Sequence, residues 1–174
     1  EEISASLAEG REAGLIEANE HQMVQNVFHL DDRPLTSLMV PRADVHWLDA
    51  DMTIAQALAA AARGREMGGH SWYPVCRGSL DEVLGIVSVA HLLSIAHPTH
   101  EVLREHVLAS SFLPETLSGM ELLDQLRSRT GRMVFVVDEY GVVQGIMTPT
   151  DLLEAITGEL RSIEGGQVWA TQRE

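Results

Sequence analysis

Thr148 and Asp151 stand three residues apart, where an apolar segment meets a segment with a helical pattern. Residues of these types at this spacing can form an anion-binding site at the start of a helix. Thr-x-x-Asp is typical of a capping box, and Pro149 fits the first helical position because that position needs no N–H. The free N–H groups of a helix start also attract phosphate, and a carboxylate beside them can accept hydrogen bonds from ribose hydroxyls. Since an isolated capping box usually only starts a helix, two interpretations remain open: a simple cap or a site for a phosphorylated ligand.

Residues 133–147 predict the β-hairpin that positions this helix start. Residues 134–137 and 142–147 are rich in β-branched side chains, which favour strands. Between them, residues 138–141 predict a tight turn in which Gly141 can adopt a positive φ. The hairpin would therefore deliver Thr148 to the end of its second strand.

An earlier segment of the chain repeats this arrangement. Residues 85–96 match residues 145–156 in outline: a glycine, an apolar pair, a hydroxyl residue and a helix that begins Leu-Leu. Ahead of each copy a capping box starts another helix, at Thr53–Gln56 and at Ser118–Glu121. Each half then predicts strand, helix, strand, strand, helix, and the halves should pack together because one alone could not bury its sheet. The expected fold class is α/β (α+β), with two pseudo-symmetric repeats after an acidic helical leader.

The hairpin with residues 145–151 resembles the nucleotide-binding signature of cystathionine-β-synthase (CBS) domains, which occur in tandem. Residues 38–42, 73–75, 138–141 and 157–160 are similar to the CBS pair of the CorC/CNNM, hemolysin-like magnesium and cobalt efflux family. The resemblance covers about residues 1–160. It implies a leader at 1–33, CBS repeats at 34–100 and 101–160, and a tail at 161–174 that leads to a C-terminal domain.

The same resemblance implies a function. In that family the CBS pair lies on the cytoplasmic face of the cell membrane, between a transmembrane domain and a C-terminal domain. It binds ATP, AMP or a related adenine nucleotide, with or without Mg²⁺, and regulates divalent-cation export. The expected role is therefore that of a regulatory module and not of an enzyme.

The resemblance also assigns a nucleotide site, mainly in the second repeat. Thr148 would contact phosphate, Asp151 the ribose, and Val134 and Phe135 the adenine. The other residues carried over as ligand-binding are Val40, Arg42, Ser71, Trp72, Tyr73, Pro74 and Thr150.

The chain departs from the family pattern within this site. The family usually has threonine at the position of Val40 and arginine at that of Trp72, so two polar groups are lost, although Trp72 could stack on adenine. In the first repeat His91 stands where the second has Asp151. We therefore expect one good nucleotide site per chain, in the second repeat.

Arginines near the predicted site leave alternatives open. Arg42 could reach a phosphate with its planar guanidinium, or it could be a surface residue paired with Asp44. Arg127, Arg129 and Arg132 cluster ahead of the strand at residues 134–137, where they could form an ordinary charged loop or contact a phosphate or a neighbouring subunit.

Composition limits the other possibilities. The formal net charge of −14 argues against nucleic-acid binding. The longest apolar run, residues 57–62, is far shorter than the roughly 20 residues of a membrane-spanning helix, and the start at Glu1 suggests a fragment of a longer chain. The lone Cys76 has no disulfide partner and indicates a reducing compartment. His97, His100 and His106 lack the spacing of a metal site.

Two further hypotheses concern assembly. The acidic leader could be a solvated face, or it could attract divalent cations where two chains meet. Alternatively to nucleotide sensing, the chain could be a ligand-free dimerisation scaffold of the same membrane protein. A homodimer would then form through the CBS helices, and the proposed apolar contact face comprises Leu122, Leu126, Leu152 and Ile156.

Overall fold

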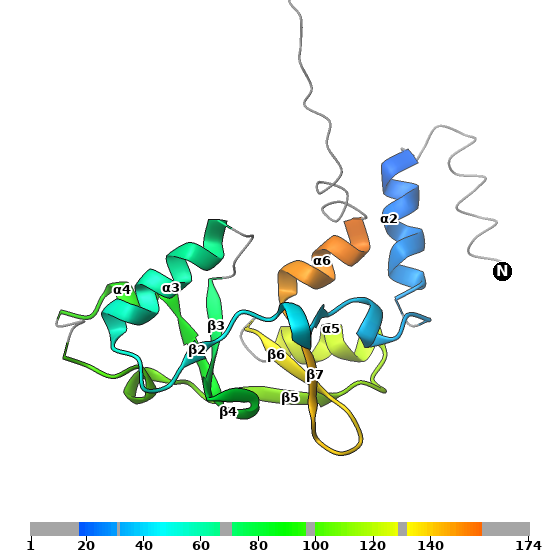
Figure 1. Cartoon of the computed structure of the whole chain (residues 1–174). Helices are drawn as coiled ribbons and strands as arrows, with labels where there is room; N and C mark the ends of the chain where they lie inside the picture. Colours follow the sequence, from blue (N-terminus) through cyan, green and yellow to red (C-terminus); the bar gives the residue numbers. More distant parts are fainter. Residues whose placement is uncertain (1–17, 31, 67–70, 97–99, 129–131, 158–174) are drawn as a thin grey trace, which may run out of the picture.

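The computed structural model describes residues 18–30, 32–66, 71–96, 100–128 and 132–157 (Figure 1). The leader contributes helix α2 (Ala18–Phe28), which is followed by the short strand β1 (Val40–Pro41). The first repeat comprises β2 (Leu48–Asp49), α3 (Ile54–Glu66), β3 (Trp72–Arg77), β4 (Ser79–Ser88) and α4 (Val89–Leu93). The second comprises β5 (Ser111–Pro114), α5 (Gly119–Ser128), β6 (Val134–Val137), β7 (Val143–Met147) and α6 (Pro149–Thr157). Short 3₁₀ turns occupy Leu35–Ser37, Arg42–Asp44 and Leu103–His106.

The predicted repeat order and mixed α/β class are confirmed. Some predictions lie outside the described residues: the leader at 1–17 with most of its acidic residues, Arg129, the motif at 158–160, and the tail at 161–174. In the described part of the chain, no helix is both long and apolar enough to cross a membrane.

Each repeat contributes a sheet with helices on one face. The first sheet has the order β2-β3-β4, and the second has the order β1-β7-β6-β5. In both, the opening strand runs parallel to the next one and the following hairpin is antiparallel. All three predicted capping boxes form, at Thr53 with Gln56, Ser118 with Glu121 and Thr148 with Asp151.

The two sheets pack face to face, and this contact explains why the repeats occur as a pair. Along β6, Val134 and Val136 face the core under α5 and α6, whereas Phe135 faces the other sheet, as strand alternation requires. There it joins Cys76 and Ile86 of the first repeat in one buried cluster. A single repeat would leave that cluster exposed.

The segments that lead into the repeats are exchanged between them. Val40 precedes the first repeat but pairs with Ile146 of β7, and Leu108 precedes the second repeat but pairs with Ile86 of β4. From the sequence we expect the opening strand of the first repeat at residues 45–48, but β2 begins only at Leu48, and the short strand β1 ahead of it was not expected. A pair of residues that bonds to a strand a hundred positions away leaves no local signal.

The predicted apolar contact face for a homodimer is also wrong. Leu122, Leu126 and Leu152 are buried in the core of their own repeat, and Ile156 packs against it. The leucines that α4 and α6 expose are Leu93 and Leu153. Helix α2 lies beside α6, where the Asn26 side chain donates a 2.8 Å hydrogen bond to the Ile156 carbonyl (Figure 1).

Candidate functional site

The start of α6 carries the predicted anion-binding pair. The Thr148 backbone N–H and hydroxyl donate to Asp151 Oδ2 at 2.7 and 2.8 Å, and the hydroxyl oxygen accepts from the Asp151 N–H at 3.3 Å. Thr148 is buried, and Thr150 is exposed in the first helical turn. Within the described part of the chain, Asp151 Oδ1 accepts no hydrogen bond, so one carboxylate oxygen remains for a ligand.

Strand register brings this helix start to the edge where β6 and β5 begin. Val134 pairs with Met147, which places Met133 opposite Thr148. Ser111 pairs with Val134 in parallel, so Ala109 stands opposite Arg132. Since neighbouring strands lie about 4.8 Å apart, all three chain segments share one edge of the sheet.

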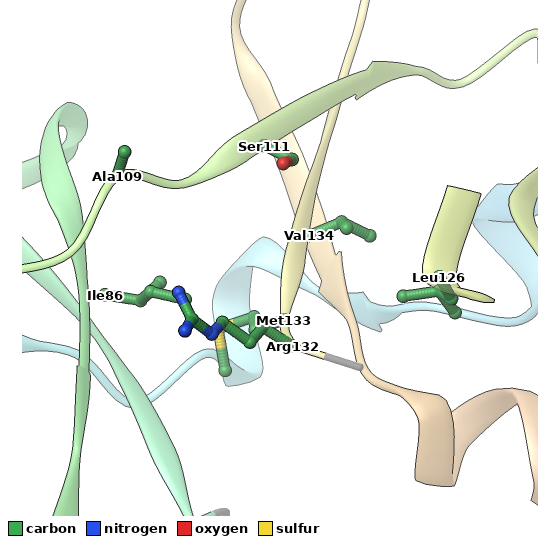
Figure 2. Close-up of a pocket in the computed structure, with 7 residues that line it drawn as sticks. All are labelled: Ile86, Ala109, Ser111, Leu126, Arg132, Met133 and Val134. Carbon is green, nitrogen blue, oxygen red and sulfur yellow. The ribbon is translucent and has the colours of Figure 1, made fainter. Parts of the chain in front are cut away.

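A pocket of about 120 Å³ opens at this edge (Figure 2). Its lining comes from β4, from the segment that includes the start of β5, from α5 and from the start of β6, and consists of Ile86, Ala109, Ser111, Leu126, Arg132, Met133 and Val134. Complete ligand sites usually measure about 300–1,000 Å³, so this pocket fits a ring-sized part of a ligand. The remainder would extend along the surface toward α6.

Trp72 and Arg132 meet across the two repeats. The Arg132 guanidinium carbon lies 5.2 Å from the centroid of the Trp72 ring, a cation–π contact. Figure 2 shows the Arg132 side chain extending away from its own strand toward Ile86 of the first repeat. Our site prediction assigned Trp72 but omitted Arg132, which the sequence marked only as part of a cluster of arginines.

Val40 and Arg42 contact different ends of β7. Val40 pairs with Ile146, two residues before Thr148, and packs on the cluster between the sheets. Arg42 instead donates to the Val143 carbonyl at 3.1 Å and pairs with Asp81 at 2.9 Å, not with Asp44 as one alternative had it. Val143 lies five residues from Thr148, or about 16 Å along the strand, so the structure does not bring Arg42 to the start of α6.

A second cavity of about 250 Å³ lies at that far end of β7. Its lining is mostly apolar, and its charged residue is Asp81. Arg42 already pairs with this carboxylate, and the helix start with its free N–H groups lies at the other end of β7, so the smaller pocket beside Thr148 is the better nucleotide candidate.

The remaining assigned residues serve mainly the core. The Tyr73 hydroxyl donates to the Ala61 carbonyl at 3.2 Å beneath α3, and Pro74 is buried beside Ile86. Phe135 is fully buried and stacks on Phe112 with ring centroids 5.2 Å apart. Ser71 is exposed, and its carbonyl accepts from the Val89 N–H. Of the predicted site, the edge thus gathers Trp72, Val134, Thr148, Thr150 and Asp151, with Val40 close by.

The two strand-helix-strand-strand-helix repeats match a known protein family. A family model for the CBS domain matches residues 36–97 and again residues 101–158. The chain belongs to the CBS-domain family. It contains two CBS domains in tandem, and the edge described above belongs to the second.

Relatives of this CBS pair include membrane proteins. The chain is 38% identical over 150 residues to the UPF0053 inner membrane protein YoaE of Escherichia coli K12, covering 84% of this chain and 28% of that protein. It is 34% identical over 161 residues to the UPF0053 protein sll0260 of Synechocystis, covering 92% of this chain and 35% of that protein. The chain therefore spans about a third of the length of these relatives.

Solved structures of CBS domains have the same fold. The CBS domain of a bacterial CNNM/CorC family Mg²⁺ transporter superposes with a TM-score of 0.83 at 29% identity, covering 91% of this chain and 96% of that one. A complex of such a domain with ATP superposes with a TM-score of 0.74 at 28% identity, covering 81% of this chain and 99% of that one. A CBS-domain pair with bound AMP from Klebsiella pneumoniae superposes with a TM-score of 0.60 at 25% identity, covering 72% of this chain and 98% of that one.

The corresponding helix start in the first CBS domain differs from this one. Ser88 precedes α4 without a side-chain cap hydrogen bond, and α4 has only 5 residues. His91, in place of an aspartate, is exposed and lies 5.5 Å from the His106 ring. Among the described residues no group of three or more histidine, cysteine or acidic side chains could hold a metal ion.

Cys76 lies in the contact between the two CBS domains and not at the edge. It is fully buried, and burial raises the pKa of its thiol to about 12, with the charge of Asp49 acting in the same direction. The thiol therefore stays protonated and packs as a small apolar group.

Proposed function

We propose that this CBS pair is a regulatory module that binds an adenine nucleotide, such as ATP or AMP, at the edge of the second CBS domain. Binding would control a membrane-embedded divalent-cation transporter from the cytoplasmic face of the membrane. The observation that carries the proposal is the ring-sized pocket beside the start of α6, where Thr148 and Asp151 stand together.

Each part of a nucleotide has a counterpart at this edge. The adenine ring would enter the pocket against Val134 and Leu126, since apolar walls suit a base. The phosphates would meet the first N–H groups of α6 and the Thr148 hydroxyl, where the helix dipole favours an anion. Asp151 would accept from the ribose hydroxyls through its free oxygen.

Nucleotide-bound relatives and the location of other relatives support this assignment. Solved CBS domains carry ATP in one case and AMP in another. One relative is an inner membrane protein, and a CBS domain of similar structure comes from a CNNM/CorC Mg²⁺ transporter. We assign no chemical step to the chain: the nucleotide would act by binding one arrangement of the domains more tightly than another.

Helix α6 offers a route for the signal. Its N-terminus faces the nucleotide site, while its last turn accepts the hydrogen bond from Asn26 of α2. A nucleotide that shifts α6 would therefore shift the leader helix. In the longer relatives, the leader would continue toward the membrane domain.

A ligand-free scaffold is the second candidate, and one observation favours it. The Thr148 hydroxyl and one Asp151 oxygen already satisfy each other, as in an ordinary capping box. A nucleotide would have to form further hydrogen bonds beside those between Thr148 and Asp151, or break and replace them.

Thermal unfolding with increasing ATP, ADP or AMP, each with and without Mg²⁺, separates the two candidates. A ligand that binds only the folded state increases the free energy of unfolding by mass action, by about 2.7 kcal/mol at a ligand concentration of 100 times Kd. The melting temperature therefore rises with ligand concentration. We expect at least one adenine nucleotide to produce this concentration-dependent shift. A melting temperature unchanged by all of them would favour the scaffold.

A further inference from the structure

We propose that Arg132 is the residue that binds the nucleotide phosphates, and that Trp72 of the other CBS domain holds its guanidinium in place. The proposal rests on the nucleotide site described above and extends it by naming the cation of that site and the residue that positions it.

Charge singles out Arg132. The chain has a formal charge of −14, so a phosphate approaches an unfavourable background potential. Among the described residues that line the pocket, Arg132 is the only charged one, and it lies one residue before Met133, the position opposite Thr148. Among the described residues no carboxylate forms an ion pair with it. Its positive charge is therefore available to an anion bound at this edge of the sheet.

Trp72 fixes the position of that charge. The guanidinium lies 5.2 Å from the ring centroid, and the ring packs on the buried cluster between the sheets. The cation–π contact occupies only one side of the guanidinium, so N–H groups on its other side can still donate to phosphate oxygens. An arginine held in this way loses less conformational entropy when the anion binds.

The same contact makes the site sensitive to the number of phosphates. Arg132 belongs to the second CBS domain and Trp72 to the first, so a phosphate bound by Arg132 would act on a contact between the domains. The base would occupy the pocket whichever nucleotide binds. The phosphate chain, not the base, would then set how the two domains are held.

The test compares ligands that share the base and differ in charge. Isothermal titration with ATP, AMP and adenosine is carried out on the wild type and on Arg132→Ala. We expect the variant to bind ATP about 10- to 100-fold more weakly, the range for a charge-assisted hydrogen bond, and to bind adenosine as the wild type does. Arg132→Lys should recover part of the ATP affinity, because it keeps the charge without the planar fork.

The matched control is Arg104→Ala. Arg104 is an exposed arginine paired with Asp51 in the first CBS domain, so its removal changes the net charge equally but should leave ATP affinity unchanged. Arg132→Gln, which keeps most of the side-chain volume, replaces the alanine variant if that one does not fold.

Trp72 is tested by rescue. Trp72→Ala should weaken ATP binding several-fold and leave adenosine binding unchanged, because Arg132 loses its platform. Trp72→Phe should restore most of the ATP affinity, since a smaller aromatic face still attracts the guanidinium. If Trp72 had only a structural role, Trp72→Ala would lower the affinity for ATP and for adenosine to the same extent.

Three results would overturn the proposal. Equal losses for ATP and adenosine in Arg132→Ala would mean that the guanidinium stacks on the base. Unchanged ATP affinity in that variant would remove Arg132 from the site while leaving the proposed function intact. A folded wild type that binds neither ATP nor AMP would overturn the proposed function itself.

Discussion

The carbonyl oxygen of Val40 lies so close to Gly145 that any Cβ at that position would collide with it. Strand β1 therefore pairs with β7 alongside a residue without a side chain, three positions before Thr148. The segment that precedes the first CBS domain is in this way held against the strand that leads to the proposed nucleotide site. An equivalent contact, Leu108 over Gly85, links the other segment to the first CBS domain.

Gly145→Ala should destabilise the protein by about 1–3 kcal/mol, the usual cost of overpacking, because neither backbone can move away without breaking the pairing. Urea unfolding measures the change. Gly78→Ala is the control: its φ is +72° and nothing lies within 4 Å, so it carries only the backbone strain. Equal losses in the two variants would contradict the role of the β1–β7 contact.

Asp151→Ala should weaken ATP or AMP binding by roughly 1–3 kcal/mol, because a charged acceptor is lost from the ribose. It also removes a helix cap, at a cost of about 1 kcal/mol in stability. Glu121→Ala removes the equivalent cap of α5 without touching the pocket lining. Titration calorimetry and urea unfolding on both variants should show similar losses of stability but a loss of affinity only for Asp151→Ala. Unchanged affinity there would remove Asp151 from the ribose contact.

Arg42→Ala should leave nucleotide affinity unchanged, since the side chain joins Asp81 to the Val143 carbonyl at the far end of β7. The ion pair is partly exposed, so its loss should cost no more than about 1 kcal/mol in stability. A double-mutant cycle with Asp81→Ala measures the coupling. A large loss of ATP affinity in Arg42→Ala would restore our sequence-based assignment of this arginine to phosphate.

Cys76 should not react with a thiol reagent in the folded protein, because burial both shields the thiol and raises its pKa to about 12. Below the ordinary thiol pKa of 9.0 the buried, protonated form is fully stabilising, and this contribution is lost as the pH rises toward 12. Labelling with a chromogenic disulfide should therefore follow unfolding in urea. Rapid labelling at pH 8 without denaturant would contradict the buried position.

Local signals explain what the sequence could predict. The hairpin, the three capping boxes and the repeat order depend on residues within a few positions of one another, and all are present. The Thr148–Asp151 pair, which we assign to a nucleotide, is local in the same sense. Its position at the start of a helix could therefore be predicted from the sequence alone.

The remaining features depend on contacts between distant segments. Nothing near Val40 signals its pairing with Ile146, and nothing near Arg42 signals Asp81. The apolar stripe of Leu122 and Leu126 is equally suited to a core or to a dimer contact, and the structure uses it for the core. Arg132 was visible as a cation but not as the partner of Trp72, because the two come from different CBS domains.

Isothermal titration of the wild-type chain with ATP tests the central claim most directly. The account predicts saturable binding near one nucleotide per chain, since in the described part of the chain the Thr148–Asp151 helix start and the pocket beside it lie together at the second CBS domain. Absence of heat from ATP, ADP and AMP alike, in protein shown to be folded, would contradict it and would leave the scaffold as the function of this CBS pair.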